Sequence, residues 1–196
     1  AGLESIFGWN SVLVAVVISL VAAAVAIFGH DLLHKSFRIL FWVSLPLWTI
    51  LTIGIFAGGV HGSIGPSGAG GFTLVAFLVQ FSVAASYNIT YAPYVSDYSR
   101  YLPRDTKPSS IIASVFIGAS ASPAWLIPLG AYLATYLGAT DALSGIYAGG
   151  NQVVSGLGGV LALVAAAVLV ATMGLNAYSG MLTVVTAIDS IRPITP

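Results

Sequence analysis

Long apolar segments alternate with short polar links along the whole chain. Five segments have the roughly 20 mostly apolar residues that a helix needs to cross the hydrocarbon of a bilayer. They cover about residues 11–28, 39–56, 72–101, 110–137 and 160–188. The pattern therefore predicts an all-α integral membrane protein with five transmembrane helices, which passes through the membrane several times.

The basic residues lie on alternate links between these segments. Lys35 and Arg38 are in the first link, and the later basic positions are Arg100, Arg104, Lys107 and Arg192. By the positive-inside rule, the links that carry these residues face the cytoplasm. The glycine-rich link at residues 57–71 and the link that contains Asp141 are then expected to face outward.

Composition agrees with a membrane protein and excludes several kinds of chemistry. The chain is 58% hydrophobic and 6% charged, with a mean hydropathy of +0.98, whereas soluble domains have roughly 25% charged residues. It has no cysteine, so a disulfide, a thiolate nucleophile and a cysteine-ligated metal are excluded. The spans contain no paired carboxylates, no nucleophile with a base and no metal triad, so we expect neither an enzyme nor a metal site. Nothing indicates a nucleic-acid partner.

The third span carries polar residues where lipid-exposed helices are apolar. Pro93 removes one amide N–H and disfavours helix at the residue before it, so a break is predicted near residues 88–93. Interrupted transmembrane helices line protein-enclosed cavities, and secondary transporters bind substrates at such breaks. The ring of Tyr91 could stack on a flat heterocycle, with the polar groups of Asn88 and Thr90 beside it. The alternative is a proline kink packed against neighbouring helices.

Asp97 and Arg100 follow the predicted break and are three residues apart. They share one face of a helix and can form an ion pair, which lowers the cost of placing charges near hydrocarbon. A structural or gating pair is the expected role. Direct proton coupling by Asp97 is the alternative.

The last span carries a polar stripe at helical spacing. Its members are Thr172, Asn176, Ser179, Thr183 and Thr186, and steps of four and three residues place them on one face. Such a face is expected to look into protein or a water-filled path. Packing between helices explains the hydroxyl residues, whereas the side-chain amide of Asn176 also suits the edge of a base-like ligand.

Three stretches resemble one transporter family. The run "APYVSDYSRYLPRDT" at residues 92–106 resembles the signature of the purine-cytosine permease branch of the nucleobase:cation symporter family. "GLNAYSGMLTVVTAIDSIRP" resembles its eighth transmembrane helix, and "FGHDLLHKSFR" resembles its link between helices four and five. The resemblance implies that residues 1–196 are an internal fragment, helices four to eight, of a single transmembrane transporter domain. That domain would have the leucine-transporter type of fold, with two inverted five-helix repeats.

The resemblance also implies roles for single residues. The family's aromatic residue that stacks on the base matches Tyr91, and the asparagine of the eighth helix that hydrogen-bonds the base matches Asn176. Sodium-coupled relatives carry two adjacent hydroxyl residues where this chain has Thr172 and Met173. A thioether is a poor ligand for a hard cation, so Thr172 is a doubtful sodium ligand and proton coupling is favoured. No cofactor is expected.

The function implied is secondary-active symport of a nucleobase, cytosine or a purine, across the cytoplasmic membrane by alternating access. The remaining helices of the full-length transporter would complete the pocket. One alternative is the same machinery carrying allantoin, hydantoin, uracil or thiamine. Another is a channel or a structural membrane subunit, which predicts an unbroken helix at Tyr91 and uptake that does not saturate.

Overall fold

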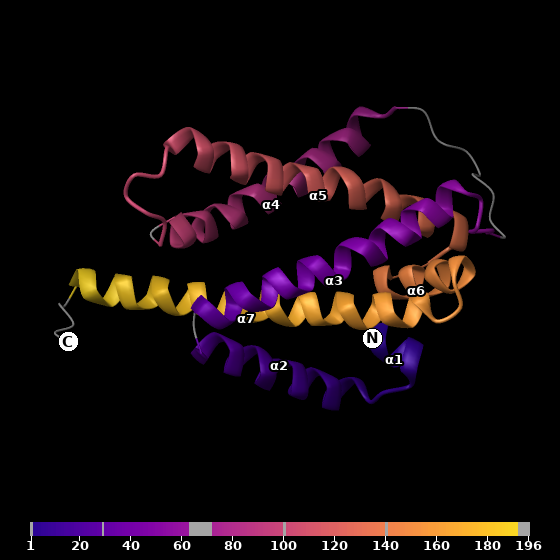
Figure 1. Ribbon diagram of the computed structural model, residues 1–196, viewed down its shortest axis with the longest axis horizontal. Helices are drawn as coiled ribbons and strands as arrows, with labels where there is room; N and C mark the ends of the chain where they lie inside the picture. The colour runs from indigo at the N-terminus through magenta and orange to yellow at the C-terminus, as the bar shows by residue number, and fades with distance from the viewer. Residues whose placement is uncertain (1, 29, 63–71, 100, 140, 192–196) are drawn as a thin grey trace. The chain divides into compact units, whose positions relative to one another are not determined.

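The structure is a computed structural model that describes residues 2–28, 30–62, 72–99, 101–139 and 141–191. Within these ranges it consists of α-helices and their connections and contains no strand (Figure 1). The chain divides into two compact units. The first comprises residues 1–65 and 130–196 and the second residues 66–129, and each is described by itself.

All five predicted spans are helices. They are α2 (Ser11–Phe28), α3 (His30–Phe56), α4 (Leu74–Ser99), α5 (Pro108–Leu137) and α7 (Leu157–Ile191). Each is long and apolar enough to cross a membrane. The 35 residues of α7 rise roughly 52 Å at 1.5 Å per residue, which exceeds the roughly 30 Å of bilayer hydrocarbon. Helix α7 must therefore be tilted or extend beyond the hydrocarbon.

The segment predicted to be the first charged link is helical instead. Helix α3 begins at His30 and includes its charged residues. Leu33 explains the difference: its side chain is only 1% exposed, so packing of this residue holds the first turns in helical form. Lys35 and Arg38 remain exposed on the same turns. The charged residues of this segment therefore lie in the first turns of α3 and not in a loop between helices.

Two short helices were not predicted, α1 (Gly2–Phe7) and α6 (Ala142–Val153). Helix α6 lies in the polar link before the last span, for which no helix was predicted. Gly145, Gly149 and Gly150 are instead buried within α6. Small residues let helix backbones approach closely, and a Cβ on Gly150 would lie 2.7 Å from the Cα of Gly158 in α7. The glycines thus serve helix packing.

The turn between α6 and α7 is tied by one side chain. Asn151 Oδ1 accepts hydrogen bonds from the backbone N–H groups of Gly156 at 3.1 Å and Gly158 at 3.2 Å. Gly156 has a φ of +86°, a conformation that glycine adopts without steric cost. These features reverse the chain within three residues and lay α6 against the start of α7.

Helix α7 is the centre of the first unit. It packs against α2, α3 and α6, and it runs between α2 and α3 in Figure 1. Leu51 of α3 and Leu161 and Ala162 of α7 are almost fully buried. Helix α7 also approaches α2 closely, since a Cβ on Gly174 would lie 3.3 Å from the carbonyl oxygen of Ala22. The core of this unit is therefore built from small and aliphatic side chains at close backbone approach.

The N-terminus of α6 depends on an acidic cap, which gives a testable prediction. Asp141 Oδ1 accepts from the N–H groups of Leu143 at 2.9 Å and Ser144 at 3.0 Å. The bonds from Ser144 lower the pKa of this exposed carboxyl from 3.8. A lowered pKa means that the carboxylate stabilises α6 above about pH 4, and that this contribution is lost as the pH falls through the folded-state pKa.

We expect Asp141→Ala in the full-length protein to destabilise α6 by about 0.5–2 kcal/mol, the usual cost of losing an N-cap. Hydrogen exchange at Leu143 and Ser144 should become faster at neutral pH. Asp141→Asn is the matched control, because it keeps a capping oxygen but removes the ionisable group. The protection factors of these amides, which correct for the pH dependence of intrinsic exchange, should not change with acidification in this control, and equal protection factors in all three proteins would refute the cap.

The second unit contains α4 and the N-terminal part of α5. In the most apolar 18-residue window of each helix, no residue is buried inside the structure. The side chains of both helices are thus mostly exposed within the described part of the chain. The inverted-repeat arrangement stays a prediction, because it concerns both units together.

Candidate functional site

Helix α4 corrects the prediction of a broken third span. The helix continues from Leu74 to Ser99 with Pro93 inside it, so the break expected at residues 88–93 is wrong. Proline lacks an N–H group and cannot donate to the carbonyl of Ile89, four residues earlier. Transmembrane helices tolerate this loss where nearby groups adjust.

Two polar side chains of α4 bond to the helix itself in the turns before the proline. Asn88 Nδ2 donates to the carbonyl oxygen of Ala84 at 2.8 Å. The Thr90 hydroxyl lies 2.9 Å from the carbonyl oxygens of both Ser86 and Tyr87 and can donate to either. These bonds give a local reason for polar residues at this depth that needs no interruption of the helix.

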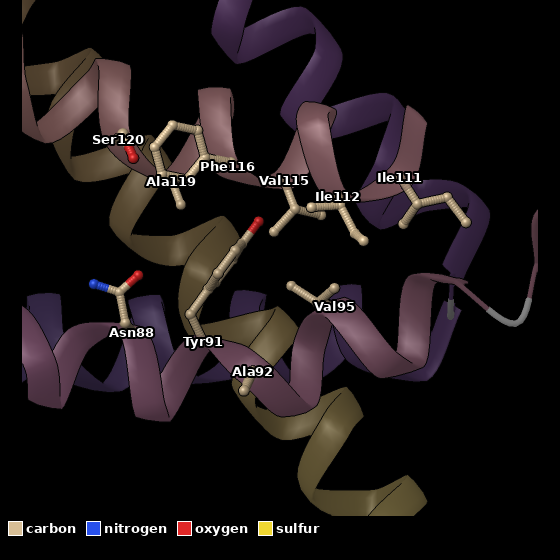
Figure 2. A pocket seen from close by; sticks show the side chains of 10 residues that line it. All are labelled: Asn88, Tyr91, Ala92, Val95, Ile111, Ile112, Val115, Phe116, Ala119 and Ser120. Carbon is tan, nitrogen blue, oxygen red and sulfur yellow. The ribbon is translucent and has the colours of Figure 1, made fainter. Parts of the chain in front are cut away.

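An open cleft of about 560 Å³ lies between the two helices of the second unit (Figure 2). This volume falls within the roughly 300–1,000 Å³ of ligand sites in proteins. We call it the α4–α5 cleft. Its lining residues are Asn88, Tyr91, Ala92 and Val95 from α4, and Ile111, Ile112, Val115, Phe116, Ala119 and Ser120 from α5.

Tyr91 is the large aromatic side chain that α4 contributes to the cleft. Figure 2 shows its ring extending from α4 toward α5, with the hydroxyl near Val115 and Phe116. The ring is half-buried. Tyr87 stacks on it with ring centroids 5.9 Å apart and an interplanar angle of 8°, and Tyr94 flanks it at 6.3 Å. Neighbouring tyrosines on the same helix therefore hold the orientation of the ring.

Polar groups in the cleft are few and lie on both walls. The amide of Asn88 projects into the cleft beside Tyr91, and the hydroxyl of Ser120 lies on the opposite wall (Figure 2). With an aromatic face, an amide and two hydroxyls among aliphatic side chains, the cleft can stack a flat ring and hydrogen-bond its edge. Sequence reasoning missed Phe116 and Ser120. Their signal was the four-residue spacing of Ile112, Phe116 and Ser120, which shares one helical face.

Other predicted residues of the second unit are placed differently. Thr90 is on α4 but does not line the cleft. Arg100 and the side chain of Asp97 lie outside the described residues. The Asp97–Arg100 pair therefore stays a prediction.

The predicted stripe of the last span lies on α7, in the first unit. Ser179 is buried, at 5% exposure, whereas Thr172, Asn176, Thr183 and Thr186 are exposed. The hydroxyl of Thr172 donates to the carbonyl oxygen of Val168 at 2.9 Å. Within its unit, only Ser179 faces the interior as the stripe predicted. The roles of Asn176 as a ligand contact and of Thr172 as a sodium ligand remain predictions.

Comparison with known proteins gives one consistent result. The family model described as a permease for cytosine/purines, uracil, thiamine and allantoin matches residues 2–196. The chain is 37% identical over 165 residues to "Putative purine-cytosine permease YxlA" of Bacillus subtilis (strain 168). That alignment covers 83% of this chain and 34% of the relative, so the chain spans about a third of the relative's length. No solved structure matches the chain.

Proposed function

Because the chain belongs to the family of permeases for cytosine/purines, uracil, thiamine and allantoin, we propose that it is part of a nucleobase transporter. The full-length protein would carry cytosine or a purine across the cytoplasmic membrane by secondary-active symport. Alternating access would move the opening from one side of a central site to the other. The observation that supports this function is the α4–α5 cleft, with Tyr91 and Asn88 in its wall.

In the proposed site, each polar or aromatic residue has a separate task. The ring of Tyr91 stacks on the base, and the amide of Asn88 bonds an edge of the base. Thr90 does not line the cleft, so its part in the site is proposed only through its hydroxyl oxygen, which can accept a hydrogen bond as well as donate one. Asn176 of α7 fixes the orientation of the base, and the remaining helices of the full-length transporter complete the pocket.

We propose a proton as the coupling ion. Met173 follows Thr172 at the position where sodium-coupled relatives have a second hydroxyl, and thioethers are poor ligands for hard cations such as sodium. The Asp97–Arg100 pair would act as a gate at the cytoplasmic end of α4. Proton uptake by Asp97 is the alternative route of coupling.

One observation favours a second class of function. A channel or a structural subunit predicts an unbroken helix at Tyr91, and α4 is unbroken there. Membership of a permease family argues for a carrier nonetheless. Saturation distinguishes the two: a carrier reaches a maximal rate as substrate increases, whereas flux through a channel continues to rise in proportion to concentration.

The test of the function is uptake of radiolabelled cytosine by cells that lack their own transporters and express the full-length protein. We expect uptake to be saturable, and we expect unlabelled cytosine or adenine to reduce it by competition. Asn176→Ala should raise the apparent KM roughly two- to tenfold, because a neutral hydrogen bond contributes about 0.5–1.5 kcal/mol. Thr183→Ala, on the same helix, is the matched control and should keep the wild-type KM.

Two results would count against this assignment. An unchanged KM in Asn176→Ala removes that residue from the site. Absence of competition by cytosine and adenine removes these substrates, and growth rescue on uracil, allantoin, hydantoin or thiamine would then identify the alternative within the family.

A further inference from the structure

The first unit has a concave surface of its own. It is an open groove of about 430 Å³ between α2, α3 and α7. The residues that line it are Val21, Val25, Ser36, Ile39, Leu40, Ala167, Val170 and Ala171. All but Ser36 are aliphatic, so the groove offers an apolar surface with a single hydroxyl. We call it the α2–α3–α7 groove.

The groove lies near one end of α2 and α3. Val25 is three residues before the end of α2 at Phe28, and Ser36 is six residues after the start of α3 at His30. At 1.5 Å per residue these positions are roughly 5–9 Å from the helix ends. The positive-inside rule assigns these ends to the cytoplasmic surface. By this prediction, the groove opens toward the cytoplasmic side of α2 and α3.

Two basic residues of α3 lie next to residues that line the groove. Lys35 and Arg38 are both exposed, beside the lining residues Ser36 and Ile39. In the described part of the chain, neither side chain forms an ion pair. Lys35 also lies four residues before Ile39, which places it at the edge of the groove-lining face. Long basic side chains keep the aliphatic stem on apolar surface and extend the charged group to the headgroups.

Few negative charges oppose these two cations. Helix α2 has no charged residue, and Asp189 is the one charged residue of α7, 18 positions beyond Ala171. On α3, Asp31 precedes Lys35 by four residues and offsets one of the two charges. The local balance of carboxylate and basic groups is therefore positive. A neutral occupant of the groove would gain nothing from this charge.

We propose that the α2–α3–α7 groove binds an anionic phospholipid of the cytoplasmic leaflet. One acyl chain would lie along the aliphatic walls, and the phosphate would contact Lys35, Arg38 and the Ser36 hydroxyl. Basic clusters between transmembrane helices on the cytoplasmic side bind anionic headgroups, and each basic residue near the surface strengthens such binding. This site is independent of the proposed transport function.

The test is native mass spectrometry of the detergent-purified full-length protein with added phosphatidylglycerol or phosphatidylcholine. We expect the wild type to retain phosphatidylglycerol in preference to phosphatidylcholine. Lys35→Gln with Arg38→Gln should weaken phosphatidylglycerol binding at least about fivefold and leave phosphatidylcholine unchanged. Arg104→Gln with Lys107→Gln removes the same charge from another link with the same predicted orientation, and should have no effect.

A second pair of variants tests the apolar part of the site. Ala167→Phe places a ring in the groove and should reduce binding of both lipids. Ala23→Phe places the same ring on the opposite face of α2 and should not. The proposal is overturned if the wild type binds both lipids equally or retains neither, as when another helix of the protein covers the groove. It is also overturned if each test variant behaves like its control.

Discussion

Replacing Tyr91 by alanine should raise the apparent KM for cytosine about five- to a hundredfold in the full-length protein. Stacking of a base on an aromatic side chain contributes about 1–3 kcal/mol, and each 1.4 kcal/mol corresponds to tenfold in affinity. The ring of Tyr91 is half-buried, and it is the one aromatic side chain of α4 among the described residues that line the α4–α5 cleft. Concentration-dependent uptake of radiolabelled cytosine measures the effect.

Conservative and neighbouring variants separate stacking from general damage to α4. Tyr91→Trp and Tyr91→Phe keep an aromatic face and should stay within a few-fold of the wild type. Tyr87→Ala removes a tyrosine one turn away that stacks on Tyr91 but does not line the cleft, and it should have a smaller effect. If Tyr91→Ala retains the wild-type KM, or if Tyr87→Ala matches its loss, Tyr91 is not the stacking residue.

The spans could be predicted from sequence because their signal is local. A helix in hydrocarbon must satisfy its own backbone groups, so each crossing leaves a continuous apolar run, and all five runs are helices. No such local signal shows whether α4 is continuous or broken at Pro93. A proline in a span is compatible with a break or with a continuous helix. Asn88 and Thr90 were interpreted as ligand contacts, whereas their side chains form hydrogen bonds to the backbone of α4.

The sequence predicted only the part of the candidate site that α4 contributes, because polar residues interrupt this apolar span. Tyr91 and Asn88 stood out for that reason, and both line the cleft. The facing wall is formed by residues such as Val115 and Phe116, which are ordinary in a transmembrane helix. Their role depends on which face of α5 approaches α4, and a single sequence does not encode that directly. The proposed contact of Asn176 belongs to the other unit and needs the uptake assay.

Helix α6 was missed because glycine has two opposite meanings in a sequence. It marks flexible links, but it also marks close contacts between transmembrane helices. The run from Gly145 to Gly158 belongs to the second case, since Gly145, Gly149, Gly150 and Gly158 are all buried. Only the partner helix reveals which meaning applies. Substitution of these glycines should therefore damage folding, whereas a link would accept it.

Gly158→Ala should strongly destabilise the contact between α6 and α7. A Cβ at this position would overlap the carbonyl oxygen of Tyr147 and lie 2.9 Å from Cγ of Asn151, the side chain that ties the turn. The oxygen belongs to the backbone of α6 and cannot rotate away, so the helices must separate. Overpacking of this kind costs about 1–3 kcal/mol and occasionally more. The thermal midpoint of the detergent-purified full-length protein should fall by several degrees.

Gly159→Ala is a control that differs by one position. Among the described residues, a Cβ on Gly159 would meet no heavy atom within 4 Å, and alanine is favoured over glycine inside a helix by about 1 kcal/mol. The control should keep or slightly raise the thermal midpoint, measured as the monodisperse fraction that remains after heating. Equal midpoints for the two variants would show that α6 does not pack on α7 through Gly158. A fall confined to Gly158→Ala supports a glycine contact that holds the start of the last span.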